Sequence, residues 1–263
     1  MPTLILDITK SIEENASRYF DKAKDMKRKI KGAEEALRQS KIKLQELETK
    51  KEQQETKKIQ EKQYAAREKQ WYEKFRWFRS SDNFLVIGGR DATTNEIVVK
   101  KHSQPGDIVF HTDIAGSPFI VIQSEKKEIP EATMREAADA TCTFSRVWKL
   151  GLQSTDVFYV APEQVTKKTK AGEFMGKGAF MIFGKTNYID NRINLAVGKT
   201  KDNSIMAGPL SAVSKHCEKY VVLYQGDEKA SSIAKKIQHF LGKDVPVDEI
   251  IRSLPAGEFK IKK

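Results

Sequence analysis

The stretch that decides the fold is WYEKFRWFRSSDNFLVIGGRDATTN, residues 71–95. A lysine-rich run ends here and an aromatic, glycine-punctuated segment begins, so the stretch marks where an extended arm meets a globular domain. Residues 71–78 contain five large rings, which belong to Trp71, Tyr72, Phe75, Trp77 and Phe78. Such a cluster is either a buried anchor or a surface on which nucleic-acid bases stack. We expect mostly an anchor, with the interleaved arginines left free.

The basic charge is concentrated in the amino-terminal part of the chain. The 263 residues include 47 Lys and Arg against 36 Asp and Glu, a net charge of +11. Residues 10–79 alone hold 21 Lys and Arg against 13 Asp and Glu, which is 8 of that surplus. A phosphate backbone suits such a charge, because each neutralised phosphate releases counterions. An anionic membrane surface would suit it as well.

The apolar runs and the cysteines indicate the cellular setting. The apolar runs, such as residues 84–87 and 118–122, fall far short of the roughly 20 residues that cross a bilayer. No basic segment precedes the first apolar residues, so we expect no signal peptide and no membrane partner. Cys142 and Cys217 fit no ligand spacing. We expect both to be reduced and buried in a cytoplasmic protein.

The region from residue 12 to residue 47 has the apolar spacing of a coiled coil. Apolar or small residues recur in alternating steps of four and three, at Ile12, Ala16, Tyr19, Ala23, Met26, Ile30, Ala33 and Leu37, and Leu44 and Leu47 extend the series. Two arrangements remain open: one continuous helix that pairs with another chain, or an antiparallel hairpin whose tip lies at about residues 48–56. We favour the hairpin.

Beyond residue 79 the sequence predicts an α+β domain. Residues 80–83 predict a turn in which Asn83 takes a positive φ. Short apolar runs predict strands, at residues 84–87, 97–99, 107–111, 118–122, 156–160, 179–183 and 220–224. Helices are expected from Ile129 to about Leu150 and over residues 227–241. In the first, Thr133 and Glu136 fit a capping box, although Pro130 could equally place the start of the helix earlier.

The predicted architecture therefore has three parts. Residues 1–75 form a long N-terminal α-helical coiled coil, and residues 76–200 form a mixed α/β globular domain. Residues 201–263 form a strand-helix extension that packs on this domain.

His111 and Asp113 are the best candidates for acid–base or metal chemistry. Two residues apart on a strand, their side chains share a face. No third ligand follows at a recognisable spacing, so the favoured interpretation is a hydrogen-bonded histidine beside a turn. We assign no catalytic residue, no metal ligand and no cofactor. A metal-dependent nuclease or hydrolase that uses His111, Asp113 and Asp91 is the alternative.

A lysine-rich segment between two predicted strands is a candidate for nucleic-acid contact. It carries four lysines and a phenylalanine, namely Lys167, Lys168, Lys170, Lys177 and Phe174. A loop held by strand ends is a usual place for a binding site, and a plain solvated hairpin is the alternative. Because the arm is also basic, we favour RNA contact here.

Five motifs in a fixed order resemble a known family. They are YEKFRWF at 72–78, GGRDA with NE at 88–96, HTDIAGSPF at 111–119, AA with SRVW at 137–148, and PEQVTK with GEF and GAFMI at 162–182. Together they resemble the RNA-binding NFACT-R domain of the NFACT proteins. LDITKSIEENASRYF at 6–20 is similar to the start of that family's middle coiled coil, so the resemblance covers about residues 6–198. The tail resembles archaeal members more loosely.

The resemblance implies a ribosome-associated quality-control factor, which recognises a large ribosomal subunit carrying an obstructed nascent chain and its tRNA. Some members recruit charged tRNA and extend the stalled chain without a template. The NFACT-N domain and the helix-hairpin-helix module have no counterpart here, so we expect a carboxy-terminal fragment or a shortened member. Ala115 stands where many relatives have a histidine, which weakens any proposal of proton chemistry in that loop.

The favoured function is thus a non-enzymatic RNA-binding module whose partners are the large ribosomal subunit and tRNA or rRNA. The expected RNA-binding residues are Arg76, Trp77, Arg79, Arg90, Lys100, Lys101, Lys167, Lys168, Lys170, Phe174 and Lys177. The family-motif residues are Asp91, Asn95, His111, Asp113, Gly116 and Trp148. A third hypothesis is a coiled-coil scaffold that binds protein, and self-association through the coiled coil remains open.

Overall fold

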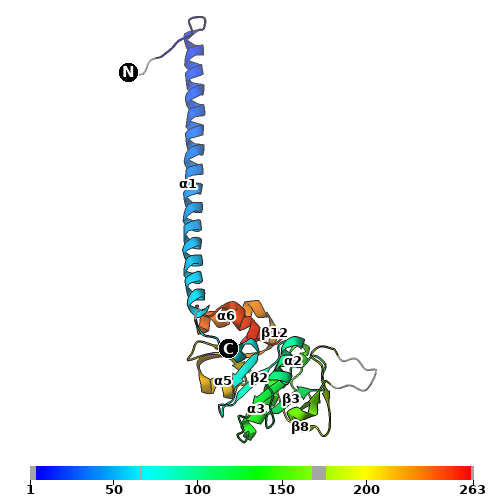
Figure 1. Ribbon diagram of the computed structural model, residues 1–263. Coiled ribbons are helices and arrows are strands. Elements are labelled where there is room, and N and C mark those ends of the chain that lie inside the picture. Colours follow the sequence, from blue (N-terminus) through cyan, green and yellow to red (C-terminus); the bar gives the residue numbers. More distant parts are fainter. Residues whose placement is uncertain (1–3, 66, 168–175, 262–263) are drawn as a thin grey trace. The chain divides into compact units, whose positions relative to one another are not determined.

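The chain divides into two compact units, Met1–Ile59 and Gln60–Lys263. The structure is a computed structural model that describes residues 4–65, 67–167 and 176–261. Most of the helix α1 (Ile12–Ala65; Figure 1) belongs to the first unit. At its start the Glu14 amide donates to Ser11 Oγ at 3.2 Å, and the Ser11 amide donates to the Glu14 carboxylate at 2.9 Å. This reciprocal pair is a capping box, which satisfies amides that the first helical turn leaves without partners.

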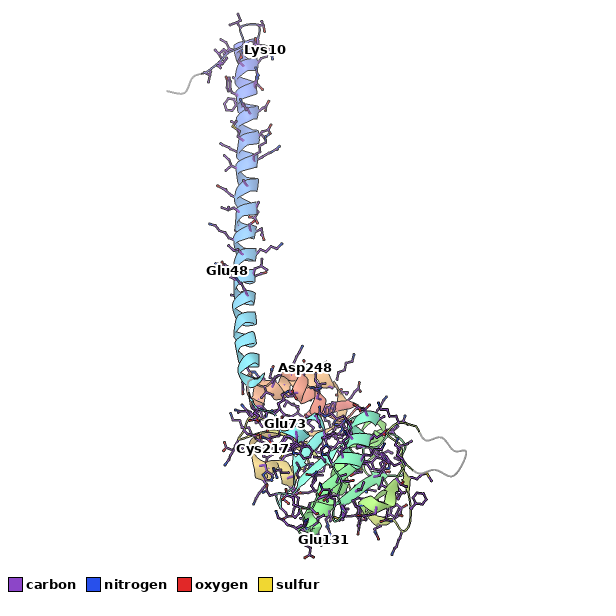
Figure 2. The ribbon with its side chains drawn as sticks, in the orientation of Figure 1. Lys10, Glu48, Glu73, Glu131, Cys217 and Asp248 are labelled. Carbon is purple, nitrogen blue, oxygen red and sulfur yellow. The ribbon has the colours of Figure 1, made fainter. Side chains whose placement is uncertain are left out.

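The predicted hairpin is wrong, because α1 continues through residues 48–56, where the tip was expected. This segment contains no Gly or Pro, and its Lys, Glu and Gln residues have high helix propensity. The described side chains of α1 stand out around the helix, as between the labelled Lys10 and Glu48 (Figure 2). The apolar series is consequently exposed: 82% of Ile12 and 60% of Leu37 are accessible to solvent.

The second unit confirms the mixed α+β class. Its larger sheet has six antiparallel strands in the order β1-β2-β4-β3-β5-β8 (Figure 1). These strands are β1 (Arg76–Arg79), β2 (Leu85–Gly88), β3 (Ile108–Thr112), β4 (Ile120–Gln123), β5 (Val157–Val160) and β8 (Asn187–Ile189). A second antiparallel sheet has the order β10-β9-β11-β12, with β9 (Leu195–Thr200), β10 (Ile205–Gly208), β11 (Cys217–Lys229) and β12 (Glu258–Ile261). β6 (Val165–Thr166) and β7 (Met181–Ile182) form a small two-stranded sheet.

Short helices connect and cover these sheets. They are α2 (Ala92–Lys101), α3 (Glu131–Phe144), α4 (Arg146–Leu150), α5 (Leu210–His216), α6 (Ala230–Leu241) and α7 (Val247–Ser253), with 3-10 turns η1 (Trp71–Lys74) and η2 (Pro162–Gln164). Among the described residues, no helix is long and apolar enough to cross a membrane.

The aromatic cluster is an anchor, as expected, but its arginines are not all free. Phe75 and Phe78 lie in the core and Tyr72 and Trp77 are buried beside them, whereas Trp71 is 44% exposed. Arg76 is half-buried and hydrogen-bonded to a main-chain carbonyl. The turn that follows β1 is confirmed, because Asn83 has φ 69° and joins β1 to its antiparallel partner β2.

Two predicted elements differ from the structure. Residues 97–99 were expected to form a strand but lie in α2, whose start is capped by the Asp91 side chain. The helix expected over 129–150 is broken at Ser145, which ends α3 and caps α4 through its hydroxyl. A single polar side chain decides each case. Asp91 starts a helix despite the β-branched composition of residues 97–99, and Ser145 breaks a helix despite the apolar spacing around it.

The expected capping box of Thr133 and Glu136 is also wrong. Thr133 donates to Asp82 at 2.9 Å, and the Glu136 carboxylate accepts from the Ser81 amide at 2.8 Å and from the Ser211 hydroxyl at 2.5 Å. Both side chains therefore fasten α3 to the β1–β2 turn and to α5 rather than capping their own helix.

Cys142 and Cys217 are free and buried, as predicted. Burial raises the pKa of each thiol to about 12. The boundary at residue 200 stays a prediction. It falls at the end of β9, which pairs with β10 and β11 from the proposed extension.

Candidate nucleic-acid interface

A cleft of about 430 Å³ in the second unit collects side chains from several separate segments. Its lining comes from Arg76, residues 89–92 and Asn95, His111, residues 115–119, Phe144, residues 177–180 and Ile182. The charged groups among these residues are three cations, Arg76, Arg90 and Lys177, and one carboxylate, Asp91. The cleft is therefore concave and positively charged overall when His111 is neutral, which suits an anionic ligand.

Small residues allow the backbone to approach closely at one wall of the cleft. A Cβ added to Gly89 would lie 1.9 Å from Asn95 Oδ1 and 2.6 Å from the Asn95 backbone nitrogen. Asn95 Oδ1 in turn accepts a hydrogen bond from the Phe119 amide at 3.1 Å. Asn95 thus fastens α2 to the residue that precedes β4, and only glycine fits beside it.

The start of α2 fixes the position of Arg90. Asp91 Oδ1 accepts from the Thr94 amide at 2.8 Å, and Thr94 Oγ1 accepts from the Arg90 amide at 2.8 Å. The Thr94 backbone hydrogen bond is the main reason that the pKa of Asp91 is lowered. Asp91 therefore stays ionised and is engaged in capping, so it does not pair with the neighbouring arginine.

Arg76 enters the cleft from β1 in a largely desolvated setting. Its Nη1 donates to the Leu254 carbonyl at 3.0 Å, and its Cζ lies 4.5 Å from the centre of the Phe144 ring. Its Nε is buried without a hydrogen-bond partner among the described residues. Burial, followed by repulsion from Arg90, lowers the pKa of Arg76 to about 10. The group remains cationic at neutral pH.

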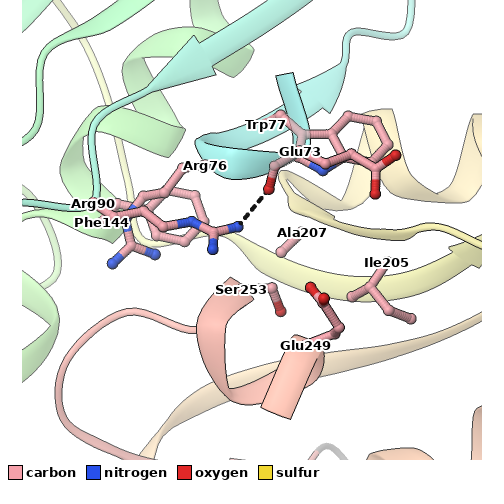
Figure 3. A pocket seen from close by; sticks show the side chains of 9 residues that line it. All are labelled: Glu73, Arg76, Trp77, Arg90, Phe144, Ile205, Ala207, Glu249 and Ser253. Atoms are coloured by element: carbon pink, nitrogen blue, oxygen red, sulfur yellow. Dashed lines mark hydrogen bonds between the residues drawn. The ribbon is translucent and has the colours of Figure 1, made fainter. Parts of the chain in front are cut away.

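Arg90 has a similar environment and lines the same small inner cavity as Arg76. Figure 3 shows both arginines among the residues that line this cavity. Arg90 Nη2 donates to the Glu73 carbonyl at 3.2 Å, and its Nε is also buried without a partner in the described part of the chain. Its pKa is lowered chiefly by burial and then by Arg252.

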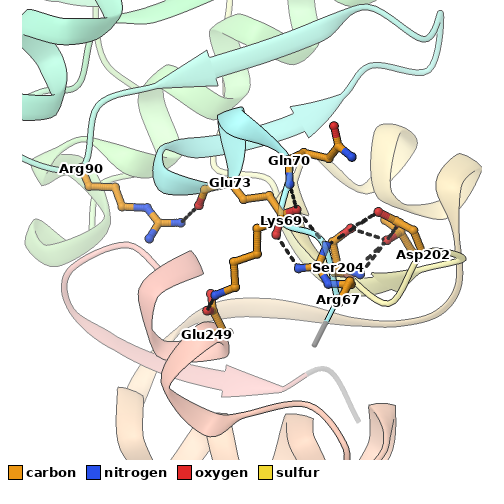
Figure 4. Close-up of polar contacts among 9 residues, drawn as sticks. Arg67, Lys69, Gln70, Glu73, Arg90, Asp202, Ser204 and Glu249 are labelled. Atoms are coloured by element: carbon orange, nitrogen blue, oxygen red, sulfur yellow. Dashed lines mark hydrogen bonds and ion pairs between the residues drawn. The ribbon is translucent and has the colours of Figure 1, made fainter. Parts of the chain in front are cut away.

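The carboxylates near this cavity are paired with other cations. The Glu73 carboxylate binds Arg67, and Glu249 binds Lys69 with Nζ and Oε1 2.6 Å apart (Figure 4). Glu249 still attracts Arg90 at a distance. No ion pair joins Arg76 or Arg90 to a carboxylate within residues 67–167 and 176–261.

His111 lies in the cleft but does not form an acid–base pair with Asp113. The His111 ring stacks on Phe119 with the ring centres 4.2 Å apart, and burial lowers its pKa. Asp113 follows the end of β3, is exposed, and accepts from the Tyr188 hydroxyl at 3.3 Å. β3 ends at Thr112, one residue before Asp113, and no hydrogen bond or ion pair joins His111 to Asp113 among the described residues. A chemical role for this pair stays a prediction.

Glu96 holds the two described ends of the lysine-rich segment. Its carboxylate pairs with Lys167 at 3.0 Å, accepts from the Gly178 amide at 3.4 Å, and also pairs with Lys100 at 2.6 Å. Hydrogen bonds from Lys100 and then from Lys167 lower the pKa of Glu96 to about 2. The motif around Asn95 contained this residue, but nothing in the local sequence showed that it reaches 71 positions along the chain.

Seven of the residues singled out from the sequence come together in the cleft. They are Arg76, Arg90, Asp91, Asn95, His111, Gly116 and Lys177. Sequence reasoning missed Phe144, which packs under Arg76, because no local signal marks the last residue of α3 as a partner of β1. It also missed Phe180 as a cleft residue, although the GAFMI motif contained it.

Other expected residues lie outside the cleft. Trp77 is 7% exposed and packs in the core, so in this structure it offers no ring face to a base. Trp148 is buried and donates from Nε1 to the Glu258 carbonyl at 3.0 Å, which is a structural role. Arg79 donates to the Asn83 carbonyl, and Lys100 and Lys101 end α2. Lys168, Lys170 and Phe174 lie outside the described residues.

The sequence of the cleft region matches a known family. Residues 74–184 match the family described as the NFACT protein RNA binding domain. Over 199 residues, 73% of this chain, the sequence is 40% identical to the archaeal Rqc2 homolog aRqcH of Methanocaldococcus jannaschii. The chain belongs to the NFACT family. The matched interval contains every described residue of the cleft.

Eukaryotic relatives agree with this NFACT assignment. The ribosome quality control complex subunit NEMF homolog of Drosophila melanogaster is 34% identical over 233 residues, 87% of this chain, and mouse NEMF is 38% identical over 180 residues, 66% of it. The chain spans only 29% of the archaeal relative, 22% of the fly relative and 16% of the mouse relative. Its relatives are ribosome quality-control factors, and it carries the NFACT RNA-binding domain.

Proposed function

We propose that the cleft binds RNA and that the chain acts in the cytoplasm as the RNA-binding module of a ribosome quality-control factor. In this proposal the module recognises the large ribosomal subunit that carries a stalled nascent chain and its tRNA. The observation that carries the proposal is the convergence of Arg76, Arg90 and Lys177 in one concave site with a single described carboxylate. Three cations held in a cleft suit a phosphate backbone.

The first test measures binding of the purified chain to isolated large ribosomal subunits, with and without peptidyl-tRNA, over a series of salt concentrations. Phosphate contacts predict that the logarithm of affinity falls linearly with the logarithm of salt concentration. The tRNA should increase the affinity. Salt-independent binding, or equal binding to a neutral polymer, would contradict the proposal.

A matched pair of charge reversals assigns the contact to the cleft. Lys177 is exposed and lines the cleft, whereas Lys215 is exposed on α5 and is not among its lining residues. Lys177→Glu should weaken binding by about tenfold, because it loses one phosphate contact and adds a repulsive charge. Lys215→Glu should change the affinity by less than about twofold. Equal effects would indicate nonspecific attraction to the whole surface.

The exposed seam of α1 favours a second function, the pairing of α1 with another helix. Leu37, Leu44 and Leu47 each expose more than half of their surface at coiled-coil spacing. Sedimentation equilibrium of the full chain should detect self-association, and Leu37→Gln should weaken it while the neighbouring Arg38→Gln does not. If the chain stays monomeric at all concentrations, α1 does not self-associate, and its coiled-coil partner would have to be a different protein.

A further inference from the structure

The arginine pair of the cleft has donor capacity that the described fold does not use. Arg76 and Arg90 each donate one hydrogen bond to a main-chain carbonyl, Leu254 and Glu73 respectively. Their Nε atoms are buried, and neither meets an acceptor in the described part of the chain. Buried polar groups are normally satisfied, so an unsatisfied one calls for a physical reason.

Among the described residues no carboxylate forms an ion pair with Arg76 or Arg90, although Glu249 and Asp91 attract Arg90 from a distance. Glu73 binds Arg67, Glu249 binds Lys69, and Asp91 caps α2. Burial first, and then repulsion from Arg90, lowers the pKa of Arg76. Two desolvated like charges destabilise a fold unless an anion sits between or beside them. An external anion would supply the missing partner.

The chemistry of the anion follows from the shape of the donors. A guanidinium is a planar fork whose N–H groups match the oxygens of a phosphate in a bidentate arrangement. Both arginines are among the residues that line the same cleft, whose volume is about 430 Å³. That volume lies in the range of about 300–1,000 Å³ that is usual for small-ligand sites.

Aromatic side chains also line the cleft. Phe180 is half-buried and meets Phe119 edge-on, with the ring centres 5.2 Å apart, and Phe119 stacks on His111. A partly exposed ring beside a cationic groove is the arrangement on which single-stranded bases stack. A base inside a duplex has both faces covered by its neighbours, so Phe180 can stack on an unpaired base but not on a base inside a duplex.

We propose that the cleft is a subsite for one unpaired nucleotide, with its phosphate held by Arg76 and Arg90 and its base against Phe180. This proposal rests on the proposed RNA-binding function and specifies the part of the RNA that the cleft takes. The phosphate belongs either to a strand end or to an internal phosphodiester. Both sources present the same oxygens to the two guanidinium groups.

The experiment follows the arginine Nε–H signals of the full chain by NMR during titration with adenosine, AMP, and oligoadenylate with and without a 5′-phosphate. A blunt RNA duplex serves as the paired control. AMP and the single strands should shift the Nε–H signals of Arg76 and Arg90, whereas adenosine should not. Tighter binding of the phosphorylated oligonucleotide would identify a strand end, and equal binding of both would identify an internal phosphodiester. Either result supports the subsite.

Variants separate a binding role from a folding role. Arg90→Lys keeps the charge but loses the fork, and it should weaken AMP binding by about tenfold. Lys215→Gln removes an exposed charge on α5, outside the cleft lining, and should leave AMP binding unchanged. Phe180→Leu should reduce oligonucleotide affinity while the AMP-induced Nε–H shifts persist. The native NMR spectrum of each variant establishes that it is folded.

The contrary outcomes are distinct from failure of the proposed function. If the chain binds large subunits but adenosine binds as well as AMP, or if no probe shifts the Nε–H signals, the subsite proposal is overturned alone. Preference for the duplex would overturn it too. Absence of binding to large subunits and to every RNA probe would overturn both proposals together.

Discussion

The helix α1 and the cleft both carry positive charge, but in opposite physical settings. Between residues 12 and 49 the lysines of α1 are exposed to solvent, whereas Arg76 and Arg90 have buried Nε atoms and are fixed by main-chain carbonyls. Solvated charges attract polyanions over about a Debye length and impose no geometry. A fixed guanidinium presents its donors in set directions. Within the net charge of +11, the exposed lysines of α1 are therefore suited to long-range attraction of a polyanion, whereas the fixed arginines of the cleft are suited to its recognition.

The same substitution should have opposite effects in the two regions. Gly89→Ala places a Cβ 2.6 Å from the Asn95 backbone nitrogen, a clash that side-chain rotation cannot relieve. We expect it to lower the free energy of unfolding by about 2–4 kcal/mol. Gly32 has nothing within 4 Å of an added Cβ and lies in exposed helix, so Gly32→Ala should stabilise α1 by about 1 kcal/mol.

Urea denaturation followed by circular dichroism measures both changes. Asn95→Ala in the Gly89→Ala background serves as the control, because it removes the Oδ1 clash but not the backbone clash. The double variant should therefore recover little stability. Full recovery would show that the cleft wall tolerates a side chain at this position.

The second prediction compares the kind of binding that each region supports. Lys27→Gln with Lys31→Gln should reduce the slope of log affinity against log salt concentration by at most about 2, because each phosphate contact contributes about 0.9. Arg90→Gln should reduce the slope by about 1 and also abolish the preference for single-stranded over duplex RNA. Fluorescence anisotropy over a salt series measures both quantities. Loss of the strand preference in the α1 variant instead would reverse the assignment.

The smallest expected effect concerns the pH dependence of stability. The pKa of Glu96 in the folded protein, about 2, lies below its ordinary value of 4.5. Its ionised form therefore stabilises the fold above about pH 4.5, and this stabilisation is lost as the pH falls toward 2. Glu96→Gln should flatten the stability profile in that interval and speed hydrogen exchange at the Gly178 amide. Glu35→Gln, on exposed α1, should leave the exchange at Gly178 unchanged, and high salt should reduce the Glu96 effect.

Much of the second unit could be predicted from its apolar runs, because a buried strand shows itself in a few consecutive residues. The Asn83 turn, the aromatic anchor and most strands of the larger sheet followed in this way. The misplaced strand at 97–99 shows the limit of the method. The β-branched triplet there predicted a strand, but the cap at Asp91 begins a helix that includes these residues. The hairpin prediction was wrong because the apolar spacing of α1 ends near residue 47, whereas the helix itself continues without a turn.

The residues of the candidate site could be listed from the sequence, but their grouping could not. Arg90, Asp91 and Asn95 are neighbours in the chain, and His111 and Gly116 belong to a second motif. That these motifs meet Arg76 and Lys177 depends on the antiparallel order of the strands. The pairing of Arg76 with Phe144 and with the Leu254 carbonyl depends on packing across long stretches of chain, which leaves no local pattern.

Several contacts lead out of the interval 74–184 that matches the family domain, among them those of Arg76, Trp148 and Phe78. Arg76 and Trp148 donate to the carbonyls of Leu254 and Glu258, and Phe78 packs so closely on Gly208 that an added Cβ would lie 2.8 Å from its ring. A gene fragment cut at the ends of the family match would strip away both acceptors and one face of the core. A fragment designed to fold by itself, or exchanged between genes by recombination, should accordingly contain the matched domain together with its carboxy-terminal strands.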